Sequence, residues 1–498
     1  MSKYISEELT EELISEMTNE HIYLIGGECG SGKTTAIMKN LYEYAKKGDS
    51  QILYLCNRSS LEEQLNESYF EAVKDHMTIG MYQAVTKYVE KHFSLPFHKM
   101  DFDYVVIDEA HLIFDASDYD INPLLFIEYL NHISSVVIAL TGTPKGFCRL
   151  EKYLNRDIKM IREVDQKNYS IRNVYFTENY NDFKEYKRKY LEVGFKNLEL
   201  TNTVYKFEKF KEENKRFRVA NIASKHRRDF PSLMNTYDYE VREEVIKFEE
   251  MKCDALITTT AMEVGVNIKA RENFLVSFNS LQMPSTIVQF ASRIRVAKND
   301  TFYVDLIFHL EKPSKKIINL MKDRLRKIDH FYKIYEDYEN GLKKYDWALG
   351  EKDYFSGIVD CREFNPITKE CLEEKIAYYE KFYESKNQNE DYEKLLSDLF
   401  PYSKIIDLQK HKVENFLDNF MGEKETVAFY NEKDKIDFRN KMKSLGIYSK
   451  NKLDLPSINL INKFFAKHKI NYGLNQGKER LNGEKNQTRY WELVKHVV

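Results

Sequence analysis

The segment from Gly27 to Thr34, Gly-Glu-Cys-Gly-Ser-Gly-Lys-Thr, constrains the fold of this 498-residue chain more than any other. It fits the pattern G-x-x-x-x-G-K-[ST], in which glycines let backbone N–H groups turn toward a polyphosphate. An apolar run, His21 to Ile25, precedes it, and a helical stretch, Thr35 to Lys46, follows it. This order predicts a nucleotide-binding α/β domain with the positive end of a helix dipole at the phosphates.

The residues of this loop have separate expected roles. Lys33 would reach the β- and γ-phosphates of ATP, and the Thr34 hydroxyl would hold Mg²⁺. The expected nucleotide contacts are Gly27, Glu28, Cys29, Gly30, Ser31, Gly32, Lys33, Thr34 and Thr35. The alternative is a glycine-rich turn without a ligand, but a chance match in such a chain has odds of only about one or two per cent. ATP hydrolysis is therefore predicted, and GTP stays open because no adenine-selecting glutamine motif precedes Gly27.

Two adjacent carboxylates, Asp108 and Glu109, follow the apolar run Tyr104 to Ile107. Ligands of open α/β sheets lie at the carboxyl ends of the strands. We therefore expect Asp108 to hold Mg²⁺ and Glu109 to polarise the attacking water. Two carboxylates after a buried strand are costly without a metal or a cationic partner, which favours this prediction over an ordinary surface loop.

Composition excludes several other classes of protein. Lys and Arg number 76 and Asp and Glu 79, so the net charge is −3 and any basic surface for nucleic acid must be local. The six cysteines show no C-x-x-C spacing, so neither a zinc site nor a disulfide framework is expected. A polar, acidic start and the lack of an apolar run near 18 residues predict no signal peptide, no membrane span and a cytoplasmic location.

Apolar runs alternate with helical stretches up to about residue 310, a pattern typical of parallel sheets covered on both faces. The expected strands also include 51–55 and 136–140, then 173–176, 198–200, 218–222, 255–258, 273–278 and 303–308. Expected helices include Ser6–Thr18 and Leu61–Val73, and later Ile317–Glu339 and Leu372–Glu384. The predicted division is an α/β domain over 1–165, a second over 166–310, a helical accessory domain over 311–440 and a basic domain over 441–498.

The last segment, residues 441–498, holds twelve Lys or Arg and four Asp or Glu, a net charge of +8. Leu455 to Lys467 is expected to form a helix with Pro456 near its start. Asn482-Gly483 is typical of a hairpin turn. A helix followed by a basic hairpin predicts a winged-helix-like module that binds nucleic acid; the alternative is a basic tail that only aids solubility.

Asp108-Glu109-Ala110-His111, together with the phosphate loop, resembles the superfamily 2 DEAH-box helicases. Further segments resemble that family in order. They are Leu53–Arg58 (motif Ia), Thr78–Gln83 (a strand-contacting segment), Leu140–Pro144 (motif III), Leu256–Ile268 (motif V) and Ser285–Arg295 (motif VI). The resemblance covers about residues 20 to 310 and implies two tandem RecA-like domains, ATP and Mg²⁺ as cofactors, and nucleic acid as partner.

The resemblance also implies roles for individual residues. Nucleic-acid contacts fall on Asn57, Arg58, Gln83, Thr259 and Thr260. Coupling between nucleotide and domain closure falls on His111, Thr141 and Thr143, and a nucleotide contact on Gly265. Catalytic roles in the second domain fall on Gln289, Arg293 and Arg295.

Motif VI has arginines four and six residues after Gln289, and Ser292 where the common pattern has glycine. This shorter form resembles the herpesvirus origin-binding helicases and related replication helicases of mobile elements. The arginine that reaches the γ-phosphate is therefore open between Arg293 and Arg295, since either guanidinium could span two of its oxygens.

The leading hypothesis is an ATP-driven helicase or translocase acting on single-stranded or tailed duplex DNA in replication or mobile-element maintenance. A second is an origin-binding ATPase that remodels a nucleoprotein complex without processive unwinding. A third is the motor subunit of a defence or restriction system with protein partners. RNA stays open as the substrate because the motor motifs contact backbone rather than bases.

Overall fold

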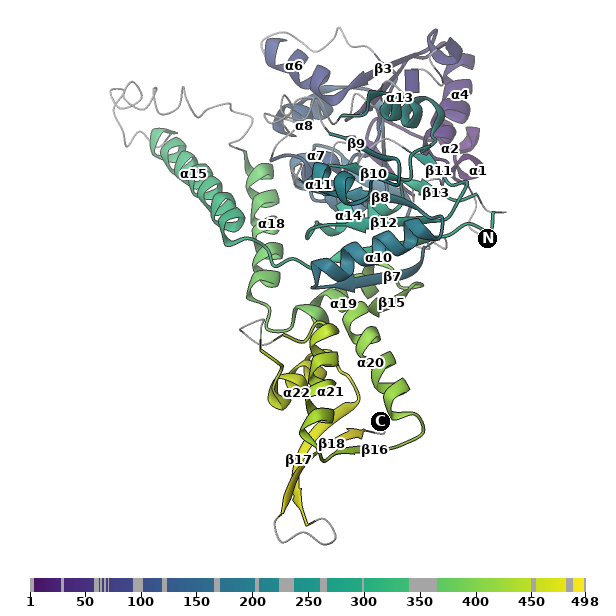
Figure 1. Cartoon of the computed structure of the whole chain (residues 1–498). Coiled ribbons are helices and arrows are strands. Elements are labelled where there is room, and N and C mark those ends of the chain that lie inside the picture. The colour runs from purple at the N-terminus through teal and green to yellow at the C-terminus, as the bar shows by residue number, and fades with distance from the viewer. Residues whose placement is uncertain are drawn as a thin grey trace.

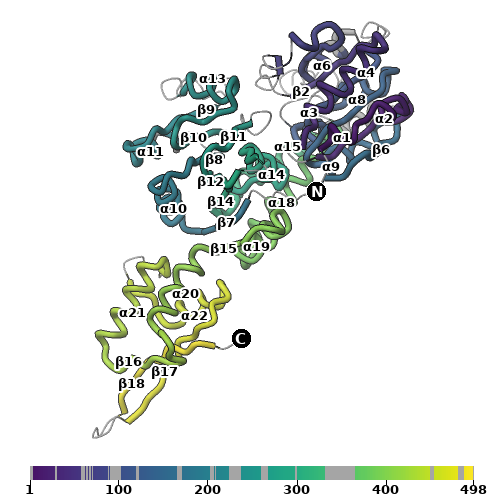
Figure 2. Tube along the Cα trace, turned by 90° about the vertical axis from the view of Figure 1, so that its right-hand side faces the viewer, coloured from purple at the N-terminus to yellow at the C-terminus, as the bar shows by residue number. Residues whose placement is uncertain are grey.

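The computed structural model describes most of the chain (Figure 1). The described residues are 4–27, 31–57, 62, 65–66, 69, 71–92, 102–118, 123–164, 171–201, 206–223, 237–259, 267–297, 300–339, 365–448, 454–480 and 487–496. Predictions for Glu28, Cys29, Gly30, Arg58, Thr260 and Gly265 lie outside the described residues. Two α/β units, a pair of long helices and a smaller C-terminal module make up the molecule (Figure 2).

The first unit is a parallel sheet in the order β3-β2-β4-β5-β1-β6. Its strands are β1 (His21–Gly26), β2 (Ile52–Cys56), β3 (Met77–Met81), β4 (Tyr104–Ile107), β5 (Val136–Thr141) and β6 (Asp157–Arg162). Along β2, Ile52, Tyr54 and Cys56 belong to one hydrophobic core, and Leu53 and Leu55 to another. Successive side chains of a strand point to opposite faces, so the sheet is covered on both sides, as predicted.

The helices of this unit are α1 (Ile5–Glu8), α2 (Glu11–Ser15), α3 (Lys33–Ala36), η1 (Ile37–Leu41), α4 (Tyr42–Lys47), α6 (Tyr82–His92), α7 (Leu112–Asp115), α8 (Pro123–His132), α9 (Pro144–Cys148) and η2 (Glu151–Tyr153). The prediction of one helix over Ser6–Thr18 is wrong. Thr10 accepts a hydrogen bond from Leu13 N and so starts α2 as a separate helix. Strand β6 was not predicted, because its charged residues at the sheet edge lack an apolar run.

The second unit is also parallel, in the order β15-β7-β14-β12-β8-β10-β9. Its strands are β7 (Ile171–Thr177), β8 (Lys196–Leu200), β9 (Val219–Ile222), β10 (Ala255–Thr258), β12 (Phe274–Phe278), β14 (Val304–His309) and β15 (Lys404–Asp407), and a separate pair is β11 (Ile268–Lys269) with β13 (Ile294–Arg295). The helices are α10 (Tyr180–Glu192), α11 (Lys206–Glu213), α13 (Tyr239–Phe248) and α14 (Pro284–Ala291). The predicted pair of tandem RecA-like sheets is confirmed, and β15 joins the second sheet from a stretch predicted to be mostly helical.

Two long helices, α15 (Lys315–Glu339) and α18 (Pro366–Glu384), lie side by side (Figure 1). The first half of α18 packs on the first unit. Ile367 and Cys371 enter its core, Thr368 Oγ1 donates to Ser117 O at 3.0 Å, and Lys375 Nζ lies 2.6 Å from Asp118 Oδ1.

The second half of α18 packs on the second unit. Phe382 belongs to its core together with residues of α19 (Gln388–Leu399). The Tyr378 hydroxyl donates to Gln282 O at 2.8 Å, just before α14. One helix therefore attaches to both α/β units.

The C-terminal module runs α20 (Leu408–Met421), β16 (Thr426–Phe429), α21 (Glu432–Ser444), α22 (Ile458–Lys467), β17 (Tyr472–Glu479) and β18 (Thr488–Lys495). Its antiparallel sheet has the order β16-β18-β17. This helix and strand order is that of a winged helix, as predicted. Its hydrophobic core extends from Val413 to Leu493, so it includes α20, β16 and α21, which lie largely before residue 441.

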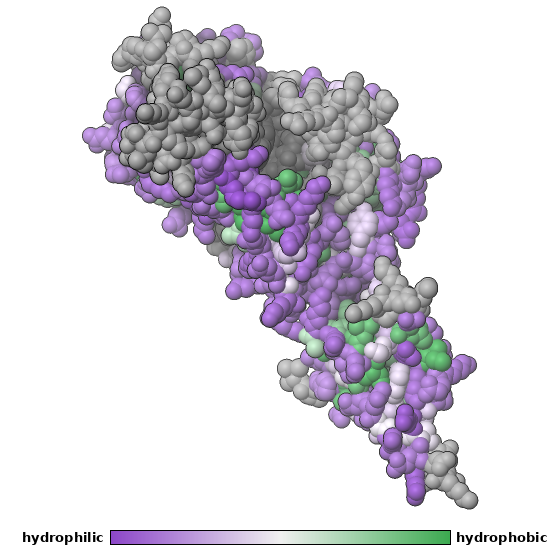
Figure 3. Space-filling model, turned by 90° about the vertical axis from the view of Figure 1, so that its left-hand side faces the viewer, coloured by the Kyte–Doolittle hydropathy of each residue, from purple (hydrophilic) through white to green (hydrophobic). Residues whose placement is uncertain are grey.

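No helix in the described part of the chain is both long enough and apolar enough to span a bilayer. On the face that Figure 3 shows, the described surface is mainly hydrophilic, and apolar side chains gather on the small lobe and near the middle of the large one.

The packing of the second core predicts a large stability effect at Phe278. Its buried ring stacks on Phe308 with 4.5 Å between ring centroids. Phe278→Ala should lower the free energy of unfolding by about 3–5 kcal/mol, because it removes apolar contacts and leaves a cavity. Urea unfolding of the full chain measures this loss. Phe248→Ala, at a side chain that is 59% exposed, is the control; equal losses in both variants would contradict the described core.

Candidate active site

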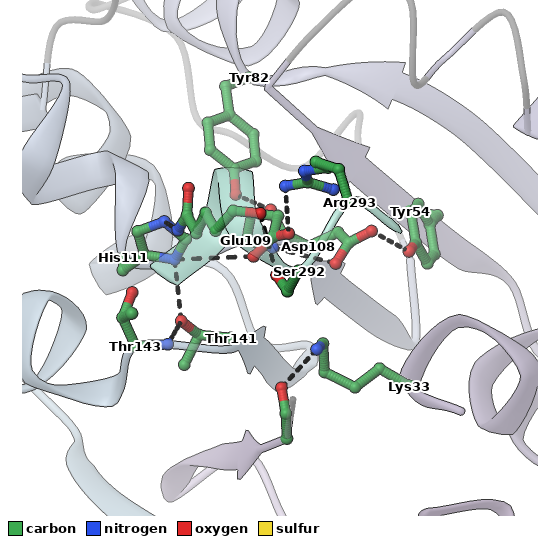
Figure 4. A network of polar contacts seen from close by, with 12 residues as sticks. Lys33, Tyr54, Tyr82, Asp108, Glu109, His111, Thr141, Thr143, Ser292 and Arg293 are labelled. Atoms are coloured by element: carbon green, nitrogen blue, oxygen red, sulfur yellow. Dashed lines mark hydrogen bonds and ion pairs between the residues drawn. The ribbon is translucent and has the colours of Figure 1, made fainter. Parts of the chain in front are cut away.

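The phosphate loop connects β1 to α3, and its backbone favours glycine at one described position. Gly32 has φ +88° and directly precedes α3. A Cβ added at Gly27 would meet the ends of two flexible side chains, Ile5 Cδ1 and Ser31 Oγ, each at 2.5 Å. The buried Lys33 ammonium donates to Gly27 O at 2.5 Å (Figure 4). Lys33 thus lies within the loop that the sequence pattern assigns to the phosphates.

Asp108 lies at the end of β4, buried between two tyrosines (Figure 4). Tyr54 donates its hydroxyl to Asp108 Oδ2 at 2.6 Å, and the Tyr82 hydroxyl donates to the Asp108 carbonyl. Burial, and next the negative charge of Glu109, raise the pKa of Asp108 to about 6. The pKa of Tyr54 is also raised, mainly by burial, so it stays a hydrogen-bond donor.

The residues present fit a magnesium ion. The Tyr54 hydroxyl hydrogen-bonds both the Thr34 side chain and Asp108, so the two predicted ligands converge. The described residues contain no group of three or more His, Cys, Asp or Glu side chains that could hold a metal. Mg²⁺ in nucleotide sites is held by one or two carboxylates together with phosphates and waters, which suits this sparse set.

Glu109 follows with a left-handed backbone, φ +53°, which is uncommon for a residue other than glycine. Burial by itself raises the pKa of Glu109, but His111, Lys33 and Arg293 outweigh it, so this pKa is lowered. Burial lowers the pKa of His111 and favours its neutral form, so we take Lys33 and Arg293 as the cations that matter. Glu109 is therefore ionised and held in a fixed, strained position.

His111 links the carboxylate pair to β5. Its Nδ1 lies 2.8 Å from Thr141 Oγ1, and Thr143 N donates to the same oxygen at 3.0 Å (Figure 4). On its other side, His111 Nε2 contacts the amide nitrogen of Gln289 in α14. The three residues predicted to couple nucleotide and domain closure therefore form one buried network that reaches the second unit.

Arg293 also crosses between the units. Its side chain is 3% exposed, and its Nη2 lies 3.5 Å from Glu109 Oε1. Arg295 is half-buried in β13, where its carbonyl accepts from Ala270 N at 2.8 Å. Among the described residues, no ion pair joins Arg295 to an acidic side chain. Arg293 is thus the arginine that the structure brings to the carboxylates.

The predicted nucleic-acid contacts that are described follow strands. Asn57 comes after β2, and Thr259 after β10; both are buried. Gln83, in α6, lies with its amide nitrogen 3.4 Å from Asn57 Oδ1. The roles of these residues stay predictions.

Sequence reasoning missed Tyr54, Tyr82 and the α18 residue Lys375. Tyr54 was detectable as a lone hydroxyl in an otherwise apolar strand, since a buried hydroxyl requires a partner. Lys375 Nζ donates to Asp115 O at 3.0 Å, at the end of the helix that follows the carboxylates. Its sequence position gave no signal, because the contact joins residues far apart in the chain.

A cavity of about 940 Å³ lies at this site. Its lining includes Lys33, Glu109 and Gln289 and, from α15 and α18, Met321 and Tyr379. Its size is in the range of small-molecule sites.

Residues 20–179 match the family model of the Schlafen group 3 DNA/RNA helicase domain. The match spans β1 to β7 and less than half of the chain. It supports a helicase-type nucleotide hydrolase in the first unit. Comparison with curated proteins gives no match.

Solved structures similar to this chain include three helicases. Lhr of Mycobacterium smegmatis, bound to single-stranded DNA and AMP-PNP, is 13% identical with a TM-score of 0.44 over 62% of this chain and 46% of its own. Dbp5 of S. cerevisiae, bound to RNA and ADP BeF3, is 15% identical with a TM-score of 0.45 over 60% and 82%. MrfA, bound to DNA and AMPPNP, is 13% identical with a TM-score of 0.43 over 64% and 49%. This chain therefore spans less than half of the Lhr chain.

The raised pKa of Asp108 predicts a pH-dependent stability of the nucleotide-free protein. The folded state holds the proton of Asp108 more tightly than the unfolded chain does. The stabilisation that this proton gives to the folded state is therefore lost as pH rises through about 6. Asp108→Asn mimics the protonated acid and should raise the melting temperature at pH 8 and by roughly half as much at pH 5, because the unfolded chain has already lost most of this proton at pH 5 while the folded state keeps it. The gain is at most about 3 kcal/mol, since each pKa unit is worth about 1.4 kcal/mol.

Melting curves in EDTA at both pH values measure this difference. Asp157→Asn, at an exposed position of β6, is the control. A gain of the same size at pH 5 and pH 8 would contradict the role given to burial.

Proposed function

We propose that this protein is an ATP-driven motor that moves along, or separates, strands of nucleic acid. The observation that carries the proposal is the contact between the two units. Gln289 and Arg293 of the second reach His111 and Glu109 of the first. A phosphate loop alone would fit a kinase or a small GTPase. A hydrolytic site shared by two RecA-like units allows the state of the nucleotide to control their separation.

In the proposed mechanism, Lys33 binds the β- and γ-phosphates of ATP. Thr34 and Asp108 would hold Mg²⁺, which supplies charge neutralisation at the phosphates when bound. Glu109 accepts a hydrogen bond from the attacking water and orients it toward the γ-phosphorus. Arg293 then leaves Glu109 for the γ-phosphate oxygens, where its positive charge stabilises the transition state.

Release of phosphate removes the group that Arg293 and Lys33 share. The His111 network then transmits the change to β5 through Thr141 and Thr143. We propose that opening and closing of the two units steps a strand past Asn57, Arg58, Gln83, Thr259 and Thr260. α18 limits the opening because it stays attached to both units.

The biological setting is a further proposal. DNA in replication or mobile-element maintenance is favoured by the resemblance of motif VI to herpesvirus origin-binding helicases. An origin-binding remodeller is the second candidate, favoured by the winged-helix module at the end of the chain.

Replacing the phosphate-loop lysine tests the proposed motor. Lys33→Ala should reduce strand-stimulated ATP hydrolysis to background, because it removes the cation that binds the γ-phosphate. The assay compares single-stranded DNA, duplex DNA and RNA in parallel, followed by strand displacement from 3′- and 5′-tailed duplexes. Lys39→Ala, an exposed lysine of the helix that follows the loop, serves as the control. Unchanged turnover in Lys33→Ala with an intact melting curve would reject the proposal.

A further inference from the structure

The C-terminal module has an uneven charge. Residues 408–440 hold six Lys or Arg and seven Asp or Glu, whereas residues 441–498 carry a net charge of +8. The basic half contains α22 and the β17–β18 hairpin, which extends away from the two α/β units (Figure 1). Residues 458–467 and 472–495, which include this helix and this hairpin, hold seven Lys or Arg and three Glu, a net +4 and so half of that charge.

These two elements are fixed against each other. The Asn462 amide donates to Leu474 O at 2.8 Å, and Leu474 N donates back to Asn462 Oδ1 at 2.9 Å. This reciprocal pair joins the middle of α22 to β17. Asn459 and Lys463, which lie four residues apart in α22, are both exposed. The helix thus presents a polar face beside the hairpin.

Two cations face each other on the hairpin. Lys478 of β17 pairs in register with Arg489 of β18, and both are exposed. Leu474 lies four residues before Lys478, and Leu493 lies four residues after Arg489; both leucines are buried against the helices. Side chains an even number of residues apart on a strand point to the same face, so Lys478 and Arg489 lie on the same side of the hairpin as these leucines. Among the described residues, neither forms an ion pair, and like charges directly opposite each other are unfavourable without a counter-ion. The adjacent Glu479 accepts a hydrogen bond from Tyr430 instead.

We propose that Lys463, Lys478 and Arg489 form a binding surface for the backbone of duplex DNA, with α22 entering the major groove. The major groove of B-form DNA admits an α-helix, whereas that of A-form RNA is too narrow. Single strands are bound by free aromatic rings. Here Trp491 lies under Lys435 and Arg439, and Tyr490 packs on Tyr430.

The same helix anchors the module to the second unit. Lys467 Nζ lies 2.6 Å from Glu178 Oε2, and His468 Nδ1 lies 2.6 Å from Asp407 Oδ2 at the end of β15. Lys412 adds an ion pair to Asp182 at 2.9 Å. A duplex held by the module would move with the second unit. The movement of a bound duplex with the second unit rests on the proposed motor function, but binding of duplex DNA to the module requires no ATP.

Fluorescence anisotropy of the full chain with a labelled 20-base-pair DNA, over a range of NaCl concentrations, tests the surface. The variant is Lys463→Glu with Lys478→Glu and Arg489→Glu. It should bind duplex DNA roughly tenfold or more weakly, and the slope of log affinity against log salt should fall by roughly 2 to 3, about 0.9 per lost phosphate contact. Substitution of the same residues by Gln should give a smaller loss in the same direction.

The control carries Lys386→Glu, Lys394→Glu and Lys424→Glu, exposed positions outside α22 and the hairpin. Equal salt slopes in the two triple variants would overturn the proposal, as would equally tight binding of duplex RNA or of a single strand. ATP hydrolysis stimulated by a short single strand, measured on the same samples, should not change in the Glu triple variant. Absence of hydrolysis in the unaltered protein would reject the motor and leave the binding result intact.

Discussion

The buried charge at Glu109 is the constraint on which the rest of the site depends. A carboxylate next to Asp108 in a closed interior is unfavourable unless cations and hydrogen-bond donors compensate for it. Lys33 supplies one cation from the phosphate loop, and Arg293 supplies the other from the second unit. The compensation of one acid therefore requires both α/β units. In the proposed motor a bound nucleotide would compete for the same two cations, which would link the state of the nucleotide to the contact between the units.

The surrounding packing keeps this cluster in place. β4 and β5 are paired in the centre of the first sheet and carry Asp108, Glu109 and Thr141 to one edge. α14 and the turn that follows it bring Gln289 and Arg293 to the opposite wall. α18 bonds to the first unit through Lys375 and to the second unit through Tyr378, so it joins the two walls. The winged-helix module follows β15 directly in the chain, and ion pairs of Lys412 and Lys467 hold it to the second unit.

Much of the fold and of the candidate site could be predicted from the sequence, for reasons that differ from one feature to the next. The phosphate loop and the carboxylates carry chemistry that only certain residues perform, and buried parallel strands are apolar throughout. The winged-helix hairpin was predicted from local charge and from Asn482-Gly483, a turn that itself lies outside the described residues. In contrast, β6 and β15 are edge strands with charged residues, and propensity alone does not separate them from loops or helices. Contacts between distant segments, such as Tyr54 with Asp108 and α18 with both units, leave no local pattern. The choice between Arg293 and Arg295 likewise needed the fold.

The most direct test of this account compares these two arginines. The measurement is the turnover number of strand-stimulated ATP hydrolysis, together with the affinity for ATP, in Arg293→Ala and Arg295→Ala. If Arg293 is the residue that passes from Glu109 to the γ-phosphate, its removal should lower turnover by roughly 10³-fold or more while ATP still binds. Arg295→Ala should retain most of its turnover. A larger loss of turnover in Arg295→Ala than in Arg293→Ala would contradict the account.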